Sequence, residues 1–556
     1  MRLGIALVPA VVTVAALGAA ATAGARTPSE IRIGGPSAPS DPKVAIVGTD
    51  RGLGGKPYSV LDRSGATVGT GSLHSAPGTA KPWSHAYAAP LTGADSPGGY
   101  RVRVPALGQT SRAWVVRPSG SADAITTILE FFAWNADGRE SPHHGASHLH
   151  DATVEGGPSD GRHLDLTGGW MDAGDMIHFA QTTAYAAAVL EAAARIDPAQ
   201  RSRLRATAAV GIRWLRKAHP RPNLFIAQVG DQRDHDHGFR DPAKDDSSGI
   251  PGIAHRRAYP GIASGGVGGD IAGKAAAALA LAYDRSHNAA DLTQARQWYA
   301  AGKAAGRANP KLPGGFYRDP HWKDSMAGGA AALYRATGER SYLDDALAFL
   351  HSAQSEADGT LGVVDSFASF AAADICGALG APPLGTASDR GFACARLRQF
   401  GAIAVEQARH NAFGMPGFFT WGTTAQNGAS GALAGLASCA TGLAGGRRVA
   451  AGARDYMLGR NPFGRSFVVG YGPRSPVHPH HWASVFGPAL PSGAVVGGPA
   501  PAREISGQGF QVSGRFDSGF ASYEDRRADY VTSEPALDYA AASVLLLAAM
   551  QSGCPS

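Results

Sequence analysis

Apolar residues recur at helical spacing along most of the chain beyond residue 182. Residues three and four positions apart share one face of a helix, so this pattern predicts amphipathic helices. The predicted helices are 182–195, 204–218, 271–285, 326–337, 342–353, 392–409, 429–443 and 537–550. Alanine dominates their apolar faces. Many such helices, joined by long loops, favour an all-α domain of packed helical hairpins, which we place at residues 122–553.

Residues 29–118 lack helical spacing and are rich in Gly, Pro and Ser. Four short runs, 44–47, 58–61, 100–104 and 113–116, have the composition of strands separated by turns. About ninety residues of this kind predict a β-sandwich. The region holds no cluster of acids or histidines, which favours a structural role, and residues 117–121 have the composition of a linker.

The first 25 residues have the pattern of a secretory signal peptide. Arg2 precedes an apolar run over residues 3–23, and Ala23-Gly24-Ala25 suits a cleavage site. A membrane anchor is the alternative, because the run approaches the length that spans a bilayer. Ala, Gly and Thr dilute its hydrophobicity, and no later segment is apolar for long enough to be a second span. We therefore expect a secreted monomer that has no membrane contact after cleavage.

Composition excludes some partners. The 556 residues are 44% hydrophobic and 17% charged, with a formal net charge of +6. No run of five or more Lys or Arg occurs, so the charge describes a mildly basic surface and not a nucleic-acid site. The four cysteines of an exported protein should be paired. Cys376 and Cys394 bracket a loop rich in Gly and Pro and should join, which by elimination leaves Cys439 to pair with Cys554.

The long loops between the predicted helices hold most of the Trp, His and acidic residues, and loops of this length are usually functional or disordered. In the stretch 168–175, Asp172 and Asp175 stand three residues apart among glycines, beside Trp170. Two carboxyl groups on such a turn can hold a water, and the glycines let a bulky ligand approach the backbone. The competing interpretation is an ordinary turn or cap, in which the carboxylates accept backbone N–H bonds.

Two loops are rich in histidine. Residues 228–237 alternate Asp and His up to His237 without the spacing of a zinc site, so polar ligand contacts fit better than a metal. His480 stands beside Trp482, and such a pair can bond a sugar hydroxyl and stack on its ring. Histidines that bond backbone carbonyls explain the second loop equally well. Neither histidine-rich loop, taken alone, indicates a function.

Aromatic and acidic residues mark three further loops. Trp322 and Trp421 stand at loop-to-helix junctions, where they could line a sugar cleft or anchor the core. In residues 523–534 we expect the two arginines to pair with neighbouring acids. Glu534 has no such partner nearby in sequence, and Pro535 with the apolar run after it places Glu534 at a helix N-terminus.

Three of these stretches occur in the same order in glycoside hydrolase family 9, the inverting cellulases, which this chain resembles. They are Gly-Gly-Trp-x-Asp-Ala-Gly-Asp at 168–175, the segment 458–472 with its following Pro-His-His, and the spaced Tyr, Asp, Tyr and Glu of 523–534. The N-terminal region resembles the immunoglobulin-like domain that precedes many catalytic domains of that family. The resemblance implies a multidomain chain: an Ig-like β-sandwich followed by an (α/α)6 barrel of six helical hairpins.

The resemblance also implies roles. Asp175 matches the base that activates water, Asp172 the acid that helps to position it, and Glu534 the general acid that protonates the leaving oxygen. An inverting enzyme needs its two carboxyl groups roughly 6.5–9.5 Å apart, one protonated and one ionised. No organic cofactor and no metal is implied. We assign substrate contacts to Trp170, His237, Trp322, Trp421, His480, Trp482, Asp525 and Tyr530.

Several positions depart from the family pattern. Trp482 stands where Arg is usual, two residues after His480, and Ala540 stands where Asn is usual. Lys274 replaces an acid four residues after Asp270, so we expect no calcium at that stretch. The presumed catalytic acids are retained while the residues around them have changed. Hydrolysis of a glycosidic bond is therefore predicted more firmly than the identity of the sugar.

Three hypotheses follow, all with a polysaccharide or oligosaccharide partner. The first is a secreted inverting hydrolase of β-1,4-glucan. The second is an exo-acting enzyme on chito-oligosaccharide or another β-glycan, and the third is a carbohydrate-binding protein without activity. A nuclease or peptidase has no support, because neither Gly-x-Ser-x-Gly with partner acids nor His-Glu-x-x-His occurs.

Overall fold

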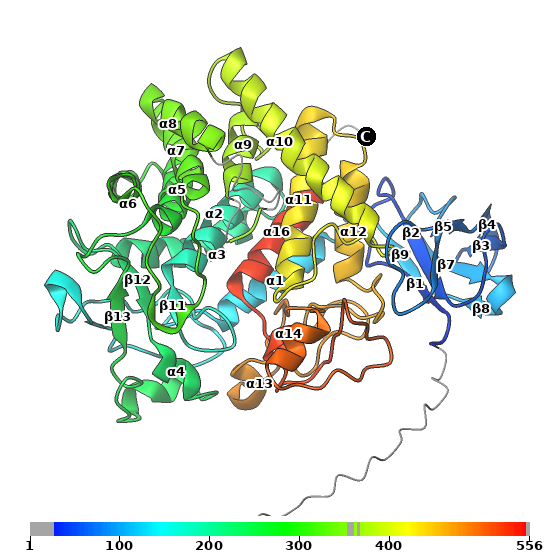
Figure 1. Cartoon of the computed structure of the whole chain (residues 1–556), viewed down its shortest axis with the longest axis horizontal. Coiled ribbons are helices and arrows are strands. Elements are labelled where there is room, and N and C mark those ends of the chain that lie inside the picture. The colour runs from blue at the N-terminus through cyan, green and yellow to red at the C-terminus, as the bar shows by residue number, and fades with distance from the viewer. Residues whose placement is uncertain (1–26, 353–360, 364–366, 552–556) are drawn as a thin grey trace, which may run out of the picture.

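A computed structural model describes residues 27–352, 361–363 and 367–551. The chain forms a β-sandwich that packs against the side of a larger helical barrel (Figure 1). The predicted fold class is therefore confirmed. The predicted signal peptide lies outside the described residues. Among the residues that are described, no helix combines the length and apolar character needed to cross a membrane.

Two antiparallel sheets form the sandwich, in the orders β1-β2-β6-β5 and β4-β3-β7-β8, with β9 paired to β7. The strands are β1 (Glu30–Arg32), β2 (Val44–Thr49), β3 (Pro57–Leu61), β4 (Thr67–Ser72), β5 (His74–Ser75), β6 (His85–Pro90), β7 (Gly98–Val104), β8 (Gln109–Thr110) and β9 (Trp114–Val116). All four predicted strand segments are found. Side chains that include Val47, Val60, Val102 and Trp114 fill the space between the sheets.

Strand β2 is buried on both faces, and its alternating side chains join the two domains. Ala45 and Val47 point into the sandwich core, whereas Ile46 belongs to the core of the helical domain together with Trp83. The Trp83 ring also lies 5.9 Å from that of Phe413. Because successive strand residues face opposite sides, one strand can serve both cores. The sandwich is thus fixed to the barrel by apolar packing.

Within the described ranges, six inner helices form a ring in which each contacts its neighbours and α16 closes onto α2. The inner helices are α2 (Ala180–Ile196), α5 (Gly269–Ser286), α7 (Lys323–Thr337), α9 (Ala368–Cys376), α11 (Thr423–Thr441) and α16 (Leu537–Gln551). Their outer partners are, in the same order, α3 (Arg201–Lys217), α6 (Ala289–Ala305), α8 (Arg340–Ser352), α10 (Ala387–Gln407), α12 (Gly446–Met457) and α1 (Ala122–Trp134). This is an (α/α)6 barrel.

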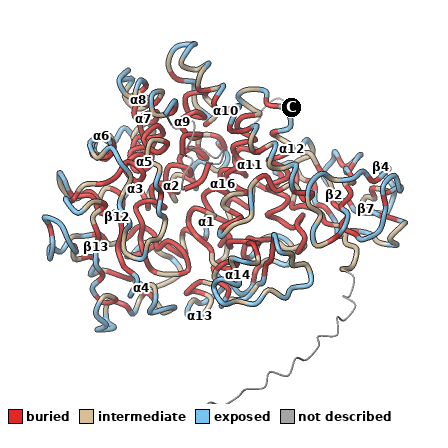
Figure 2. The backbone as a smooth tube through the Cα atoms, viewed as in Figure 1, coloured by how far each residue is buried: buried red, intermediate tan, exposed pale blue. Residues whose placement is uncertain are grey.

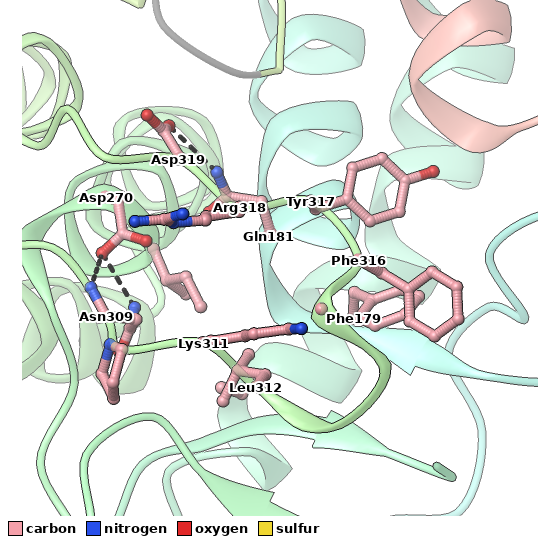
Figure 3. A pocket seen from close by; sticks show the side chains of 14 residues that line it. Phe179, Gln181, Asp270, Asn309, Lys311, Leu312, Phe316, Tyr317, Arg318 and Asp319 are labelled. Atoms are coloured by element: carbon pink, nitrogen blue, oxygen red, sulfur yellow. Dashed lines mark hydrogen bonds between the residues drawn. The ribbon is translucent and has the colours of Figure 1, made fainter. Parts of the chain in front are cut away.

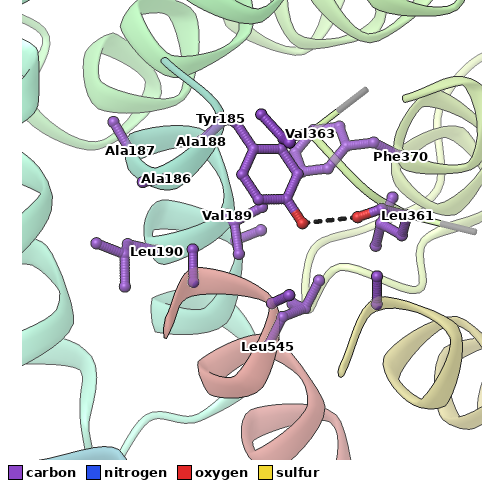
Figure 4. Packing of buried hydrophobic residues seen from close by; sticks show 14 of the residues in the cluster. Tyr185, Ala186, Ala187, Ala188, Val189, Leu190, Leu361, Val363, Phe370 and Leu545 are labelled. Carbon is purple, nitrogen blue, oxygen red and sulfur yellow. Dashed lines mark hydrogen bonds between the residues drawn. The ribbon is translucent and has the colours of Figure 1, made fainter. Parts of the chain in front are cut away.

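Alanine allows the inner helices to be buried on every side. In α2 every residue except Arg195 is buried, and alanine combines high helix propensity with a small side chain. Figure 4 shows α2 packed beside Leu545 of α16, with the Tyr185 hydroxyl donating to the carbonyl of Leu361 at 2.7 Å. The most deeply buried residues accordingly concentrate in the barrel and at its junction with the sandwich (Figure 2).

Loops and short elements gather at one end of the barrel (Figure 1). A small sheet has the order β10-β13-β12-β11. Its strands are β10 (Thr153–Val154), β11 (His178–Phe179), β12 (Ile226–Val229) and β13 (Arg257–Pro260). The short helices at this end are α4 (Gln232–Asp236), α13 (Ala483–Phe486), α14 (Ala502–Gly507) and α15 (Tyr530–Ser533). Short 3-10 turns lie at Pro105–Leu107, Gly157–Ser159, Pro242–Ser247, Pro313–Gly315 and Ala408–His410.

The disulfide prediction is confirmed for one pair. Cys376, the last residue of α9, is bonded to Cys394 in α10, with Cα atoms 5.0 Å apart. The bond therefore ties an inner helix to its outer partner. Cys439 is also disulfide-bonded, and Cys554, its predicted partner, lies outside the described residues.

Candidate active site

The turn that carries Asp172 and Asp175 is fixed by its backbone. Gly169 has φ +81°, and a Cβ there would lie 2.5 Å from the Trp214 ring, so only glycine fits. The amide of Met171 donates to the carbonyl of Asn135 at 2.8 Å. The amide of Asp172 donates to Ile177 at 2.9 Å, which closes the turn. The loop after α1 therefore fixes the position of both carboxyl groups.

The turn faces a cleft of about 410 Å³ at the loop-rich end of the barrel. Asp172, Asp175 and Glu534 all line this cleft, although Glu534 is more than 350 residues further along the chain. The amide of Gly174 donates to Oε1 of Glu534 at 3.3 Å. A Cβ at Gly174 would lie 3.1 Å from the same oxygen and would collide with the carbonyl of His480. The glycine thus lets Glu534 approach the turn.

Glu534 follows α15 directly and is held by its backbone, because its carbonyl accepts from the amide of Gly497 at 2.8 Å. Desolvation in the cleft, and then repulsion from Asp175, raise the pKa of Glu534 to about 8. The carboxyl group is consequently mostly protonated at neutral pH, as a general acid must be.

Asp172 is held by Tyr317, whose hydroxyl donates to Oδ2 of Asp172 at 2.6 Å. Burial, followed by repulsion from Asp538, raises the pKa of Asp172 well above its usual range. Burial also raises the pKa of Asp538 to about 7. Tyr317 has φ +45°, a left-handed conformation that costs a non-glycine residue about 1–2 kcal/mol. The strained tyrosine contributes its hydroxyl to the acid cluster.

His235 completes the cluster, and the sequence analysis missed it. Its Nδ1 lies 2.9 Å from Oδ2 of Asp175. The bond to Asp175 is the main cause that raises the pKa of His235 to about 9, so the imidazole is protonated at neutral pH. The short helix α4, capped by the Asp231 side chain, turns His235 toward the cleft and leaves His237 exposed. The alternating Asp and His pattern gave no means of choosing between the two histidines.

A buried ion network supports the turn from below. Arg256, with no exposed surface, pairs with Asp137, Asp151 and Asp234. Its guanidinium also donates to the carbonyl of Met176, the residue after Asp175. The network therefore holds the turn that carries Asp172 and Asp175 in place through its backbone.

The same network contains a group with the residue types of a metal site. Asp137, His148 and His178 each offer one ligand atom, and these atoms lie within 4.8 Å of one another. Both ring nitrogens of His148 are already bonded, to Asp137 and Asp245 at 2.9 Å. The guanidinium of Arg256 lies 3.3 Å from Asp137 and would repel a cation. The group fits hydrogen bonding better than a metal.

Three predicted substrate residues do line the cleft: Trp421, His480 and Tyr530. The Trp421 and Tyr530 rings are 5.5 Å apart, and Trp421 remains 40% exposed. Nδ1 of His480 lies 2.6 Å from the carbonyl of Arg527, and burial lowers the pKa of His480. The neutral ring then donates from Nδ1 and leaves Nε2 as an acceptor.

The structure corrects the other substrate assignments. Trp170 and Trp482 are each 1% exposed and pack in apolar clusters, so neither reaches the cleft. Trp322 packs against Phe349 with ring centroids 5.7 Å apart, and like His237 it is not among the cleft residues. These Trp residues were predicted to contact substrate from their residue type alone. In the structure their large apolar side chains pack in the core.

Asp525 also lies outside the cleft lining and has a supporting role. It pairs with Arg465 at 2.7 Å and accepts from the amides of Val477 and His478 at about 3 Å. These bonds fix the loop that leads to His480. The sequence predicted that both arginines of this stretch pair with neighbouring acids. Arg526 does so, with its guanidinium 3.4 Å from Glu524.

Phe316 and Tyr317 also line a second, small cavity (Figure 3). In it Gln181 donates to Asp319 at 3.2 Å, and Asp270 accepts from Asn309 at 2.8 Å. Buried Lys274 donates to Asp319, to Ser325 and to the carbonyl of Asp270 at 2.7–3.2 Å. The Lys274 ammonium group therefore bonds to the oxygens beside this cavity, and through Asp319 it anchors the loop that carries Tyr317.

The cleft at one end of the barrel combines several carboxyl groups with aromatic walls, and paired carboxyl groups are what glycoside hydrolysis uses. The profile of glycosyl hydrolase family 9 matches residues 122–547. The chain therefore belongs to that family and is a glycoside hydrolase.

Individual proteins are similar over most of the chain. Endoglucanase 5 of Arabidopsis thaliana is 28% identical over 460 residues, which are 74% of this chain and 70% of that protein. Endoglucanase A of Bacillus pumilus is 30% identical over 427 residues, 70% of this chain but only 60% of that protein. A thermostable endoglucanase from Alicyclobacillus acidocaldarius has the same fold, with TM-score 0.76 and 23% identity over 94% of this chain and 99% of that one.

Proposed function

We propose that this chain is a secreted hydrolase that cleaves β-1,4-glucan with inversion, with Asp175 as general base and Glu534 as general acid. The observation that carries the proposal is the contact across Gly174. It brings Glu534, with its pKa raised to about 8, beside the turn that bears Asp175. An acid and a base that line the same cleft are what single-displacement hydrolysis requires.

The protons have defined routes in this mechanism. Glu534 gives its proton to the glycosidic oxygen as the bond to the anomeric carbon breaks. Asp175 accepts a proton from the attacking water, and protonated His235 holds the Asp175 carboxylate in orientation through Nδ1. Asp172, fixed by Tyr317, helps to position the water. Each cycle leaves Glu534 ionised and Asp175 protonated, and exchange with solvent restores both.

The substrate class rests on the relatives and on the cleft. The similar proteins are named endoglucanases. Trp421 and Tyr530 present aromatic rings at the cleft, which suits stacking on the apolar face of a pyranose. The proposal also includes an Ig-like domain at residues 29–118, a catalytic domain at residues 122–553, and residues 1–25 as the signal peptide that directs secretion.

The decisive experiment follows the product anomer. Wild-type protein acts on cello-oligosaccharides in an NMR tube, and initial release of the α-anomer supports inversion. Asp175→Asn and Glu534→Gln should each lower kcat by about 10²–10⁴-fold. Asp165→Asn, an exposed aspartate ten residues before the base, serves as the matched control. Initial release of the β-anomer, or full activity in both variants, would overturn the assignment.

Endo action is tested separately. Carboxymethyl-cellulose should lose viscosity faster than reducing ends accumulate, because internal cleavage shortens chains early. Steady release of monomer from cello- or chito-oligosaccharides without loss of viscosity would instead identify the exo-acting alternative.

A further inference from the structure

A second large pocket, of about 460 Å³, lies between the β-sandwich and the barrel and shares no lining residue with the catalytic cleft. Strands β1 and β8 form one wall, and the segment from Gly459 to Arg474 forms the other. Three arginines line it: Arg32 and Arg112 from the sandwich and Arg474 from the barrel side.

Two glycines leave room for the guanidinium groups: Arg32 and Arg474 approach each other at Gly464, and Arg112 lies at Gly459. A Cβ at Gly464, which has φ +60°, would collide with Nη1 of Arg32 and lie 2.7 Å from Nη2 of Arg474. A Cβ at Gly459 would lie 2.9 Å from Nη2 of Arg112. Side chains at either position would separate the arginines.

The pocket has more positive than negative charge. Of the three arginines, only Arg32 has a carboxylate partner among the described residues, Glu30 at 3.5 Å. Arg112 donates to the carbonyl of Ile33 at 2.7 Å, and Arg474 to that of Phe463 at 2.7 Å. Carbonyls satisfy donors but cancel no charge. Arg112 and Arg474 therefore have no ion pair among the described residues, although Asp455 attracts Arg112 at longer range and both side chains reach solvent.

A nearby acid does not change this balance. Asp455 lies close to Gly34 at the domain junction, but it pairs with Arg454 at 2.9 Å and Arg460 at 3.3 Å. Asp41 also pairs with Arg454. These two acids are thus compensated by two other arginines.

Arg32 and Arg474 are held at a cost. Arg32 is only 6% exposed, and its Nε has no partner among the described residues. Burial lowers the pKa of Arg32 to about 10, and Arg474 and Arg112 contribute to that shift by repulsion. Arg474 has φ +44°, a conformation that non-glycine residues rarely adopt. Strain and unpaired charge of this kind are typical of a binding site.

We propose that this interdomain pocket binds a tetrahedral dianion, inorganic phosphate or sulfate. The double negative charge matches the two arginines that have no ion pair among the described residues. Guanidinium groups bind such oxygens in a two-pronged geometry that lysine cannot reproduce. The anion contacts both domains and therefore strengthens their junction, independently of the reaction in the cleft.

Thermal unfolding of the full chain tests the proposal. At constant ionic strength, exchange of chloride for phosphate or sulfate should raise Tm saturably by roughly 1–3 °C. Titration calorimetry should give one site, for which phosphate and sulfate compete. A Tm that follows ionic strength alone, without saturable heat, would overturn the proposal.

Variants locate the site. Arg112→Gln and Arg474→Gln should abolish the saturable response, and Arg474→Lys should weaken phosphate binding about tenfold, because the charge stays and the fork is lost. Arg63→Gln, an exposed arginine of the same sandwich outside the pocket, is the matched control and should respond as wild type. An unchanged response in all three pocket variants would place the anion elsewhere. Calorimetry on wild type remains decisive if a variant fails to fold.

Discussion

Two clusters of buried charge contact the turn 171–178, and they are organised in opposite ways. Beneath the turn, carboxylates face cations: Arg256 pairs with three acids, and His148 bonds two. Although burial alone would raise it, His148 and His178 hold the pKa of Asp137 well below its usual range. Each negative charge there has a partner.

On the cleft side, acids outnumber cations. Asp172, Glu534 and Asp538 all have raised pKa values, chiefly because of burial, and each also faces another acid or lies beside one. Among the residues that the structure describes, only His235 forms an ion pair with Asp175. The difference predicts that the lower cluster, around Arg256, stabilises the fold and that the upper cluster, in the cleft, supplies the protons of the proposed reaction. Four substitutions test this division.

Arg256→Met should have the largest effect. Asp137, Asp151 and Asp234 would lose a shared guanidinium, and removal of one partner from a buried ion pair costs about 3–5 kcal/mol. The free energy of unfolding in urea measures the loss. Arg257→Met, at the next residue, is the control, because Arg257 is 43% exposed and reaches only Glu155 at 3.7 Å. Equal stability of the two variants would refute the structural role of the lower cluster.

Glu534→Gln should change how stability depends on pH. The pKa of Glu534 is raised in the folded state, so its contribution is complete below the unfolded value near 4.5 and is lost as pH rises through about 8. Wild type should lose up to roughly 1.4 kcal/mol per pH unit in that window relative to the variant. Urea titrations at pH 5 to 8 measure this, and Glu524→Gln, an exposed glutamate, should follow wild type. Parallel curves for wild type and Glu534→Gln would contradict a raised pKa.

His235→Gln should lower kcat by about 10–100-fold with little change in KM, because Asp175 loses the charged partner that orients it. The pH profile of kcat should also change, because His235, with its pKa raised to about 9, would no longer titrate beside Asp175. His237→Gln is the matched control, two residues away and exposed. A larger loss in His237→Gln would restore the sequence-based assignment.

The sequence predicted the large elements well and the contacts less well. Eight helices with strong periodicity were found, whereas α1, α6, α9 and α12 of the barrel were missed. In α9 all nine residues are buried, which leaves no polar face to give a helical pattern. The acid trio was reached through resemblance, since no local pattern connects Glu534 to residue 175 across the chain. Trp170 and Trp482 were misassigned because residue type does not show whether an indole faces a cleft or a core.

Trp421→Ala should have the smallest effect and sharpens the comparison at the rim of the cleft. The ring is 40% exposed and belongs to neither charge cluster, so it contributes stacking area and no proton. Loss of an aromatic contact worth about 1 kcal/mol should raise KM roughly fivefold and leave kcat and Tm nearly unchanged. Phe418→Ala provides the control, since Phe418 is similarly exposed but does not line the cleft. A fall in kcat without a change in KM would mean that Trp421 stabilises the transition state. Catalysis would then depend on this aromatic ring as well as on the acid cluster.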